Sequence, residues 1–206
     1  AIDIAIYDLF GKLHKIPLYK LFGGYSSSMT TDLTISVNAP EEMVTDSLEA
    51  LAEGKTKLKL KIGTNADMDI KRVKAIREAV GNAVKIRLDA NQGWNPKEAV
   101  RTIRKFEDLG LDIEFIEQPV KAHDFEGLKY VTDYVETNIM ADEAAFGPYE
   151  VFKLLSMRAC DLINIKLMKA GGLHNAIKIA DMAETMGVQC MMGYMLESKV
   201  GISAAA

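Results

Sequence analysis

Residues 58–90, LKLKIGTNADMDIKRVKAIREAVGNAVKIRLDA, contain the pattern that decides the fold. Apolar and polar residues alternate over 58–63 and again over 85–90, and this is the period of a β-strand. Between them, residues 68–81 follow a helical pattern and close on Gly81, a frequent helix terminator. A strand, a helix and a second strand in this order predict a βαβ unit with parallel strands.

The same unit recurs along the whole chain, with helical patterns between the predicted strands. The strands are predicted at residues 32–37, 58–63, 85–90, 113–118, 139–143, 162–167 and 189–195. An unbroken series of such units favours an α/β fold of the (β/α) barrel type, which has about eight strands when complete. We therefore expect strands 1–7 of a barrel, in a portion of a larger protein. A doubly wound sheet is the alternative, but no dinucleotide-binding glycine motif follows the first strand.

The composition narrows the possible partners. The chain has 206 residues, a net charge of −4 and a pI of about 5.5, so nothing favours nucleic acid or an anionic membrane surface. Its apolar runs are shorter than a membrane helix requires, and its first residues lack the basic region of a signal peptide. Cys160 and Cys190 lack metal-ligand spacing and are predicted to be buried free thiols. We expect a cytoplasmic homo-oligomer that acts on a small molecule.

Ionisable residues stand at the ends of five successive predicted strands. Barrel active sites lie at the carboxyl ends of the strands. The residues at these ends are Lys59 and Lys61, Asp89, Glu117, Asp142 and Lys166. Such charges are costly in a packed barrel unless they are paired or bind a metal, so the series predicts one polar site. Lys55 and Lys57 share the alternation but stand at the strand start, where we expect them in solvent.

Three carboxylates, those of Asp89, Glu117 and Asp142, are predicted to meet on adjacent strands. They would repel one another unless a cation lies between them, and an all-oxygen set of ligands suits Mg²⁺, with Mn²⁺ also possible. Lysines flank the three acids on both sides, on strands that are nearly opposite in a barrel of eight. This arrangement suits the removal of a proton alpha to a carboxylate, with a lysine as the base and the metal stabilising the enediolate.

Several motifs taken together resemble the enolase superfamily. They are KLK before IG, LDANQGW, IEQP, ADE and DLINIKLMKAGG. The spacing Asp161-x4-Lys166-x4-Gly171-Gly172 is similar to the signature of the muconate-cycloisomerase-like subgroup. TDLTISVN and NIKLMKAGGL look most like the dipeptide epimerase branch, which includes L-Ala-D/L-Glu epimerase. The resemblance extends over essentially the whole chain.

The resemblance implies roles for individual residues. Those matching the family's Mg²⁺ ligands are Asp89, Glu117 and Asp142. Those matching its two acid/base catalysts are Lys61 and Lys166, while Lys59 matches a supporting lysine that neutralises the substrate carboxylate. Positions that support these groups are Asn91, Gln118 and Glu143, and positions that line the substrate cavity are Thr34 and Met195.

The resemblance also implies a division of the chain. Residues 1–24 are expected to be the last helix of a capping domain and the lead-in to the barrel, and residues 25–206 the partial barrel itself. The rest of the capping domain and the family's last strand, which set substrate specificity, are expected to lie outside this sequence.

The function that follows is a Mg²⁺-dependent epimerase, which inverts the alpha carbon of a dipeptide residue by means of two lysines. Other members of the subgroup would use the same site, namely an N-acylamino acid racemase, an o-succinylbenzoate synthase or a muconate cycloisomerase. Outside the subgroup, the alternatives are a Schiff-base aldolase that uses Lys61 or Lys166, and a non-catalytic barrel.

Overall fold

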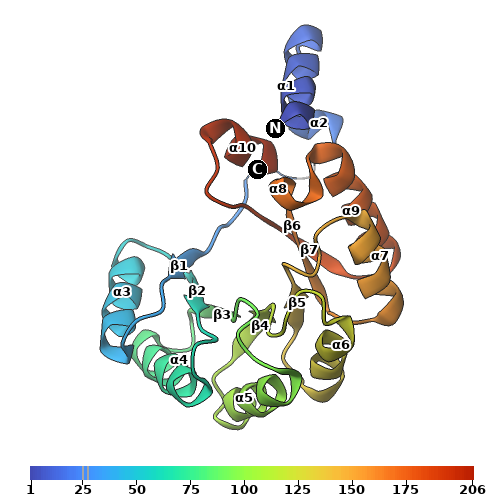
Figure 1. Cartoon of the computed structure of the whole chain (residues 1–206). Coiled ribbons are helices and arrows are strands. Elements are labelled where there is room, and N and C mark those ends of the chain that lie inside the picture. Colours follow the sequence, from blue (N-terminus) through green and yellow to red (C-terminus); the bar gives the residue numbers. More distant parts are fainter. Residues whose placement is uncertain (25, 27) are drawn as a thin grey trace.

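A computed structural model of the chain describes residues 1–24, 26 and 28–206. The strands of this part form one parallel sheet in the order β1-β2-β3-β4-β5-β6-β7, which curves into an open arc (Figure 1). Strand order follows chain order, as in a barrel, whereas a doubly wound sheet would reverse it at a switch point. The predicted partial barrel is therefore confirmed. Among the described residues, β1 and β7 are the two edges of the sheet.

Every predicted strand is present, and each ends one or two residues earlier than its sequence pattern suggests. The strands are β1 (Leu33–Ile35), β2 (Lys57–Lys61), β3 (Lys85–Asp89), β4 (Ile113–Glu117), β5 (Ile139–Ala141), β6 (Leu162–Lys166) and β7 (Gln189–Gly193). The backbone turns away from the sheet at these ends, and the turns carry several of the predicted site residues.

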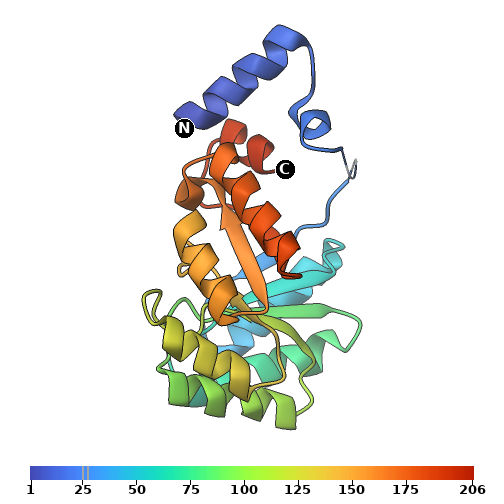
Figure 2. The ribbon, with the colours of Figure 1, turned by 90° about the vertical axis from the view of Figure 1, so that its right-hand side faces the viewer.

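Helices connect successive strands and cover the outer side of the arc (Figures 1 and 2). The connecting helices are α3 (Pro40–Ala52), α4 (Ala66–Val80), α5 (Pro96–Asp108), α6 (Phe125–Tyr134), α7 (Pro148–Met157), α8 (Leu167–Ala170) and α9 (Leu173–Thr185). The helices near the chain ends are α1 (Ile2–His14), α2 (Leu18–Leu21) and α10 (Lys199–Ala205).

Within the described residues, the sequence supplies side-chain caps where four of these helices begin, α4 and α5 among them. The Asn65 side chain accepts a hydrogen bond from the backbone N–H of Met68 at 3.0 Å and begins α4. Asn95 does the same for Glu98 at 3.0 Å, and Pro96 is the first residue of α5. Both caps satisfy backbone donors that a helix start leaves without an intrahelical partner.

The alternation within the strands separates a core from the interior of the arc. Leu58 and Leu60 of β2 are completely buried, as are Ile86 and Leu88 of β3, and all four belong to the core that packs the sheet against its helices. Successive side chains of a strand point to opposite faces, so Lys59 projects into the interior instead. Burial of the apolar face thus decides which side chains reach the site.

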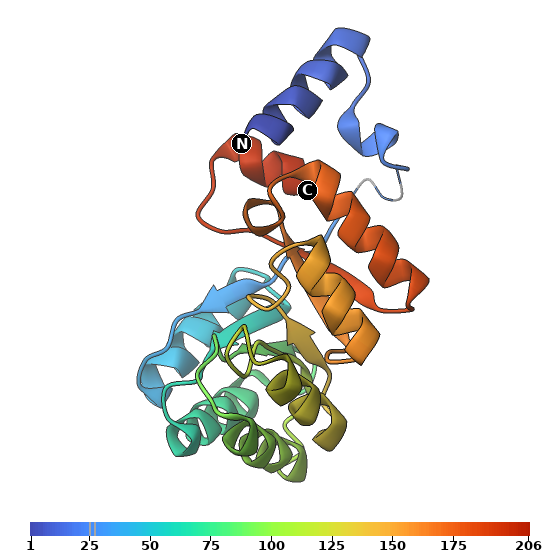
Figure 3. The same cartoon turned by 45° about the vertical axis from the view of Figure 1, so that its right-hand side comes forward.

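Helix α1 lies outside the arc and contacts α9 (Figure 3). The Asp3 Oδ2 atom accepts a hydrogen bond from the backbone N–H of Leu173 at 2.6 Å, at the start of α9. A Cβ atom at Gly172 would lie 2.3 Å from Asp3 Oδ2, so the second glycine of the AGG sequence makes room for this contact. Residue 25, where we expect the barrel segment to begin, lies outside the described residues.

Cys160 is buried as predicted, but the prediction for Cys190 is wrong because this residue is exposed on the edge strand β7. Neighbouring Met192 on the same strand is 37% exposed, since no further strand covers this edge within the described residues. Across the same part of the chain, the helices are all too short or too polar to span a membrane.

Candidate active site

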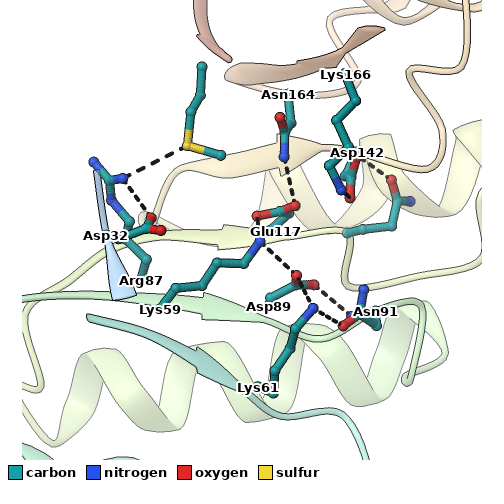
Figure 4. A network of polar contacts seen from close by, with 12 residues as sticks. Asp32, Lys59, Lys61, Arg87, Asp89, Asn91, Glu117, Asp142, Asn164 and Lys166 are labelled. Atoms are coloured by element: carbon teal, nitrogen blue, oxygen red, sulfur yellow. Dashed lines mark hydrogen bonds and ion pairs between the residues drawn. The ribbon is translucent and has the colours of Figure 1, made fainter. Parts of the chain in front are cut away.

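The register of the sheet brings the predicted site residues together. Lys61, Asp89 and Glu117 are paired in register on β2, β3 and β4, so their side chains emerge at one height. Asp142 follows β5 directly, and Lys166 is the last residue of β6. Parallel strands present their carboxyl ends at the same rim, and Figure 4 shows the side chains converging there.

Two lysines of β2 contact the carboxylates of β3 and β4. Lys59 Nζ lies 2.9 Å from Asp89 Oδ2 and 2.7 Å from Glu117 Oε2. Lys61 Nζ lies 2.7 Å from the same Asp89 oxygen and donates a hydrogen bond to Asn91 Oδ1 at 2.6 Å. Lys59 is buried whereas the Lys61 side chain is 32% exposed, so Lys61 is the more accessible of the two from solvent.

Two further lysines contact Asp142 from the other side. Lys166 Nζ lies 2.5 Å from Asp142 Oδ2, and Lys169 Nζ lies 2.5 Å from Asp142 Oδ1. Lys169 also donates to the backbone oxygens of Asp142 and Asn164. The two oxygens of one buried carboxylate are thus divided between two ammonium groups.

Glu117 lies between these two groups of ion pairs. It is completely buried, and its Oε1 atom accepts a hydrogen bond from Asn164 Nδ2 at 2.9 Å. Its Oε2 atom is close to Lys59 but accepts no hydrogen bond of regular geometry from the described residues. Burial and the charge of Asp89 raise the pKa of the Glu117 carboxyl to about 7, although Lys59 opposes the shift.

Nearby charges shift the other buried groups in both directions. Burial alone would raise the pKa of Asp142, but the charges of Lys169 and Lys166 lower it to about 2. Burial would lower the pKa of Lys59, but Glu117 and Asp89 raise it above the ordinary lysine value. For Lys169 burial prevails over the attraction of Asp142, and its pKa is lowered.

The residues predicted to support the site form a second layer of hydrogen bonds. Gln118 Oε1 accepts from the backbone N–H groups of Asp142 at 3.0 Å and Ala144 at 2.9 Å. The backbone N–H of Asn91 donates to Asp89 Oδ1 at 3.0 Å, and its side chain donates to Glu143 Oε1 at 3.2 Å. The Asp89 carboxylate is therefore fixed by the loop after its own strand, and the backbone of Asp142 is fixed by Gln118 after the neighbouring strand.

These loops need an unusual backbone. Asn91 and Gln118 have φ values of 41° and 38°, in the left-handed region that few residues other than glycine adopt. A Cβ atom at Gly63 would lie 2.2 Å from the backbone oxygen of Ala90, and one at Gly93 would lie 2.1 Å from that of Gly63. The glycines of KIG and NQG thus allow the loops after β2 and β3 to stack backbone against backbone.

A cavity of about 990 Å³ opens above the ion pairs. Lys59, Lys61, Asp142 and Lys166 line it, as do Thr34, Met195 and Arg87. The two residues predicted to line a substrate cavity therefore do border a hollow beside the lysines. Whether they contact a substrate stays a prediction.

Residues 42–206 match the family model "Enolase C-terminal domain-like". The chain belongs to this family. The resemblance to the enolase superfamily, drawn from five short motifs, is thereby confirmed, and so is the enolase-type barrel.

Within this enolase family, the chain is 56% identical over 205 residues to the L-Ala-D/L-Glu epimerase of Clostridium acetobutylicum, covering 100% of the chain and 57% of the relative. It is 51% identical to the hydrophobic dipeptide epimerase of Enterococcus faecalis, covering 100% of the chain and 58% of the relative. The chain thus spans a little over half the length of the curated relatives it matches.

Solved structures agree with the sequence comparison. The substrate-liganded L-Ala-D/L-Glu epimerase of Bacillus subtilis superposes with a TM-score of 0.98 at 54% identity, covering 100% of the chain and 58% of that structure. The Enterococcus faecalis dipeptide epimerase complexed with Mg and L-Leu-L-Tyr gives 0.97 at 51% identity, with the same two coverages. The likeness to the dipeptide epimerase branch of the enolase family is confirmed.

Three site residues were missed by the sequence analysis. Asn164 precedes Lys166 by two positions and so faces the same side of β6, a signal that strand periodicity could have supplied. By the same rule Arg87 shares a face with Asp89. Lys169 gave no such signal, because its contact with Asp142 depends on the turn into α8.

Arg87 joins three elements beneath the carboxylates. Its guanidinium group lies 2.5 Å from Glu114 Oε2 and 2.8 Å from Asp32 Oδ2, and it donates to Met191 Sδ at 3.8 Å. Asp32 directly precedes β1 and Met191 belongs to β7, so the side chain bridges the interior of the arc (Figure 4). It forms part of the floor of the cavity.

The three carboxylates predicted to hold a metal are paired with lysines in this structure, and their part in binding a metal stays a prediction. Among residues 1–24, 26 and 28–206, no three His, Cys, Asp or Glu side chains are grouped so that they could hold a metal ion. The reason is that Lys59 lies between Asp89 and Glu117, while two lysines take both oxygens of Asp142. The chemistry of the donors nevertheless fits Mg²⁺, because all are carboxylate oxygens and Glu117 Oε2 is buried without a regular hydrogen bond.

Proposed function

We propose that this chain carries the catalytic barrel of a Mg²⁺-dependent dipeptide epimerase. The observation that supports this most is the placement of Lys61 and Lys166 beside different carboxylates, Asp89 and Asp142, with Glu117 between them (Figure 4). β2 and β6 are four strands apart in the sheet, so the two ammonium groups approach the cavity from opposite directions. Both lysines border the cavity.

Inversion of an alpha carbon needs a base on one face and an acid on the other. One lysine, as the amine, takes the proton alpha to the substrate carboxylate, and the other, as the ammonium, returns a proton to the opposite face. Lys59, buried beneath Lys61, supplies a fixed positive charge for the substrate carboxylate. Asn91, Gln118 and Glu143 hold the site through the loop hydrogen bonds described above.

Asp89, Glu117 and Asp142 would hold the Mg²⁺ ion, and Mn²⁺ has the same preference for oxygen ligands. When bound, the ion supplies positive charge that stabilises the developing negative charge on the substrate carboxylate. The relative from Enterococcus faecalis with Mg and a dipeptide supports this assignment. Thr34 and Met195 would contact the dipeptide from the cavity wall.

The division into residues 1–24 and residues 25–206 is likewise a proposal. We infer that the first segment is the end of a capping domain, held to the barrel by the Asp3 contact with α9. A homo-oligomeric state and a cytoplasmic location stay predictions.

The proposal can be tested by hydrogen exchange. The complete protein is incubated in D₂O with Mg²⁺ and a panel of L,L-dipeptides, and loss of the alpha-proton signal is followed by nuclear magnetic resonance. We expect exchange at one alpha carbon, together with the appearance of an epimer, and both should stop in EDTA. If no dipeptide in the panel exchanges, the proposed epimerase function is wrong.

A second candidate keeps the site and changes the substrate. The chain is 39% identical to the N-succinyl-L-Arg/Lys racemase of Bacillus cereus, covering 99% of the chain and 55% of the relative. N-Succinyl amino acids therefore belong in the same panel. Exchange of these compounds without exchange of dipeptides would favour an N-acylamino acid racemase.

A further inference from the structure

The ammonium group of Lys169 donates three hydrogen bonds within the site. Its Nζ atom donates to Asp142 Oδ1 at 2.5 Å, to the backbone oxygen of Asp142, and to the backbone oxygen of Asn164 at 3.0 Å. An ammonium group has three donors, and here each finds an acceptor. The side chain is only 11% exposed. Lys169 therefore ties the end of β5 to β6 from the short helix α8.

Asp142 is consequently anchored at several points. Its backbone N–H donates to Gln118 Oε1, and its backbone oxygen and Oδ1 both accept from Lys169. The remaining carboxylate oxygen, Oδ2, faces Lys166 at 2.5 Å. Oδ1 thus accepts from Lys169, a buried lysine whose other hydrogen bonds go to backbone oxygens. Oδ2 contacts Lys166, the lysine proposed to react with substrate.

We propose that Lys169 is a positioning residue, which holds Asp142 by Oδ1 so that Oδ2 is presented to Mg²⁺ when Lys166 turns to the substrate. This inference rests on the proposed function. Lys169 has no role in proton transfer, because its donors are all used by Asp142 and Asn164. Its contribution is to fix one rotamer of a metal-binding carboxylate.

A positioning role and a purely electrostatic role for Lys169 have opposite effects on Mg²⁺ affinity. A cation this close to a ligand repels a divalent ion, so removing it would strengthen Mg²⁺ binding. If Lys169 positions Asp142, its removal weakens binding instead, since outer partners of metal ligands contribute about 10–100-fold to affinity. The sign of the change in affinity therefore separates the two roles.

The experiment measures Mg²⁺ binding to the complete, metal-free protein by isothermal titration calorimetry. We expect Lys169→Met to weaken binding about 10–100-fold. Lys169→Gln is equally neutral but keeps a donor for Asp142, so its affinity should lie between those of the methionine variant and the wild type. Lys178→Met on the exposed face of α9 is the matched control and should bind like the wild type. Circular dichroism verifies that each variant is folded.

Turnover supplies an independent readout. Because Lys169 acts through Asp142, saturating Mg²⁺ should restore exchange by the Lys169→Met protein to within a few-fold of wild type. A deficit that persists at saturation would overturn the inference, and so would unchanged or tighter Mg²⁺ binding. Failure of the wild-type protein to bind Mg²⁺ would instead overturn the proposed metal site, and the role of Lys169 with it.

Discussion

Replacing Glu117 with glutamine should remove a pH-dependent loss of stability from the metal-free protein. Glu117 is completely buried, and its Oε1 atom accepts a hydrogen bond from Asn164. Burial and the charge of Asp89 raise the pKa of its carboxyl from the ordinary 4.5 to about 7, with Lys59 opposing the shift. Between these two pH values the folded protein keeps a proton that the unfolded chain has released.

This difference makes the free energy of unfolding fall as the pH rises. One pKa unit corresponds to 1.36 kcal/mol, so the shift of Glu117 from 4.5 to about 7 corresponds to a loss of about 3 kcal/mol. The loss is absent below pH 4.5, where both states carry the proton, and complete above about pH 7.

The assay is urea unfolding in EDTA at a series of pH values from about 5 to 8. Glutamine keeps an acceptor for Asn164 but cannot ionise, so the stability of Glu117→Gln relative to wild type should rise by up to about 3 kcal/mol across the series. The side-chain amide of the glutamine places an N–H donor against Lys59, and this lowers the free energy of unfolding of the variant equally at every pH. The change of relative stability with pH is therefore unaffected. Identical pH dependence in the two proteins would show that ionisation of Glu117 does not cause the loss of stability.

Four further substitutions test the strand direction, the loop packing and the support of Glu117. Lys57→Ala should leave turnover within a few-fold of wild type in steady-state assays, because Lys57 stands at the start of β2, away from the rim. Gly63→Ala should lower the free energy of unfolding by more than about 2 kcal/mol, since its Cβ would meet a backbone oxygen at 2.2 Å. Gly54→Ala, also at positive φ but in open space, should cost about 1 kcal/mol. Asn164→Leu should reduce kcat about 10–100-fold by leaving a Glu117 oxygen without its donor, as measured by the exchange assay.

Much of the fold could be predicted because its signals are local. The alternation of residues 58–63 and the helix closing on Gly81 follow from strand and helix geometry alone. The rim position of Asp89 then follows from strand direction. The strand ends were predicted less accurately, because the sequence pattern does not reveal where residues in the left-handed region, such as Asn91, turn the backbone away from the sheet.

The arrangement of charges within the site was harder to predict. Sequence spacing indicates which side chains reach the rim, but not which of them pair. Lys59 contacts both Asp89 and Glu117 because its side chain is long enough to reach both β3 and β4. The two oxygens of Asp142 contact different lysines for the same reason. Lys57 was expected to lie in solvent, but it is half-buried because β2 already begins at this residue.

Lys61 and Lys166 are proposed to serve opposite faces of one alpha carbon. Alpha-proton exchange in D₂O with Mg²⁺ tests this role, using both epimers of an accepted dipeptide and the Lys61→Ala and Lys166→Ala forms of the complete protein. We expect that neither variant interconverts the epimers, and that each still exchanges the proton of one epimer, a different one in each variant. Continued epimerisation by either variant, or exchange of the same epimer by both, would contradict it.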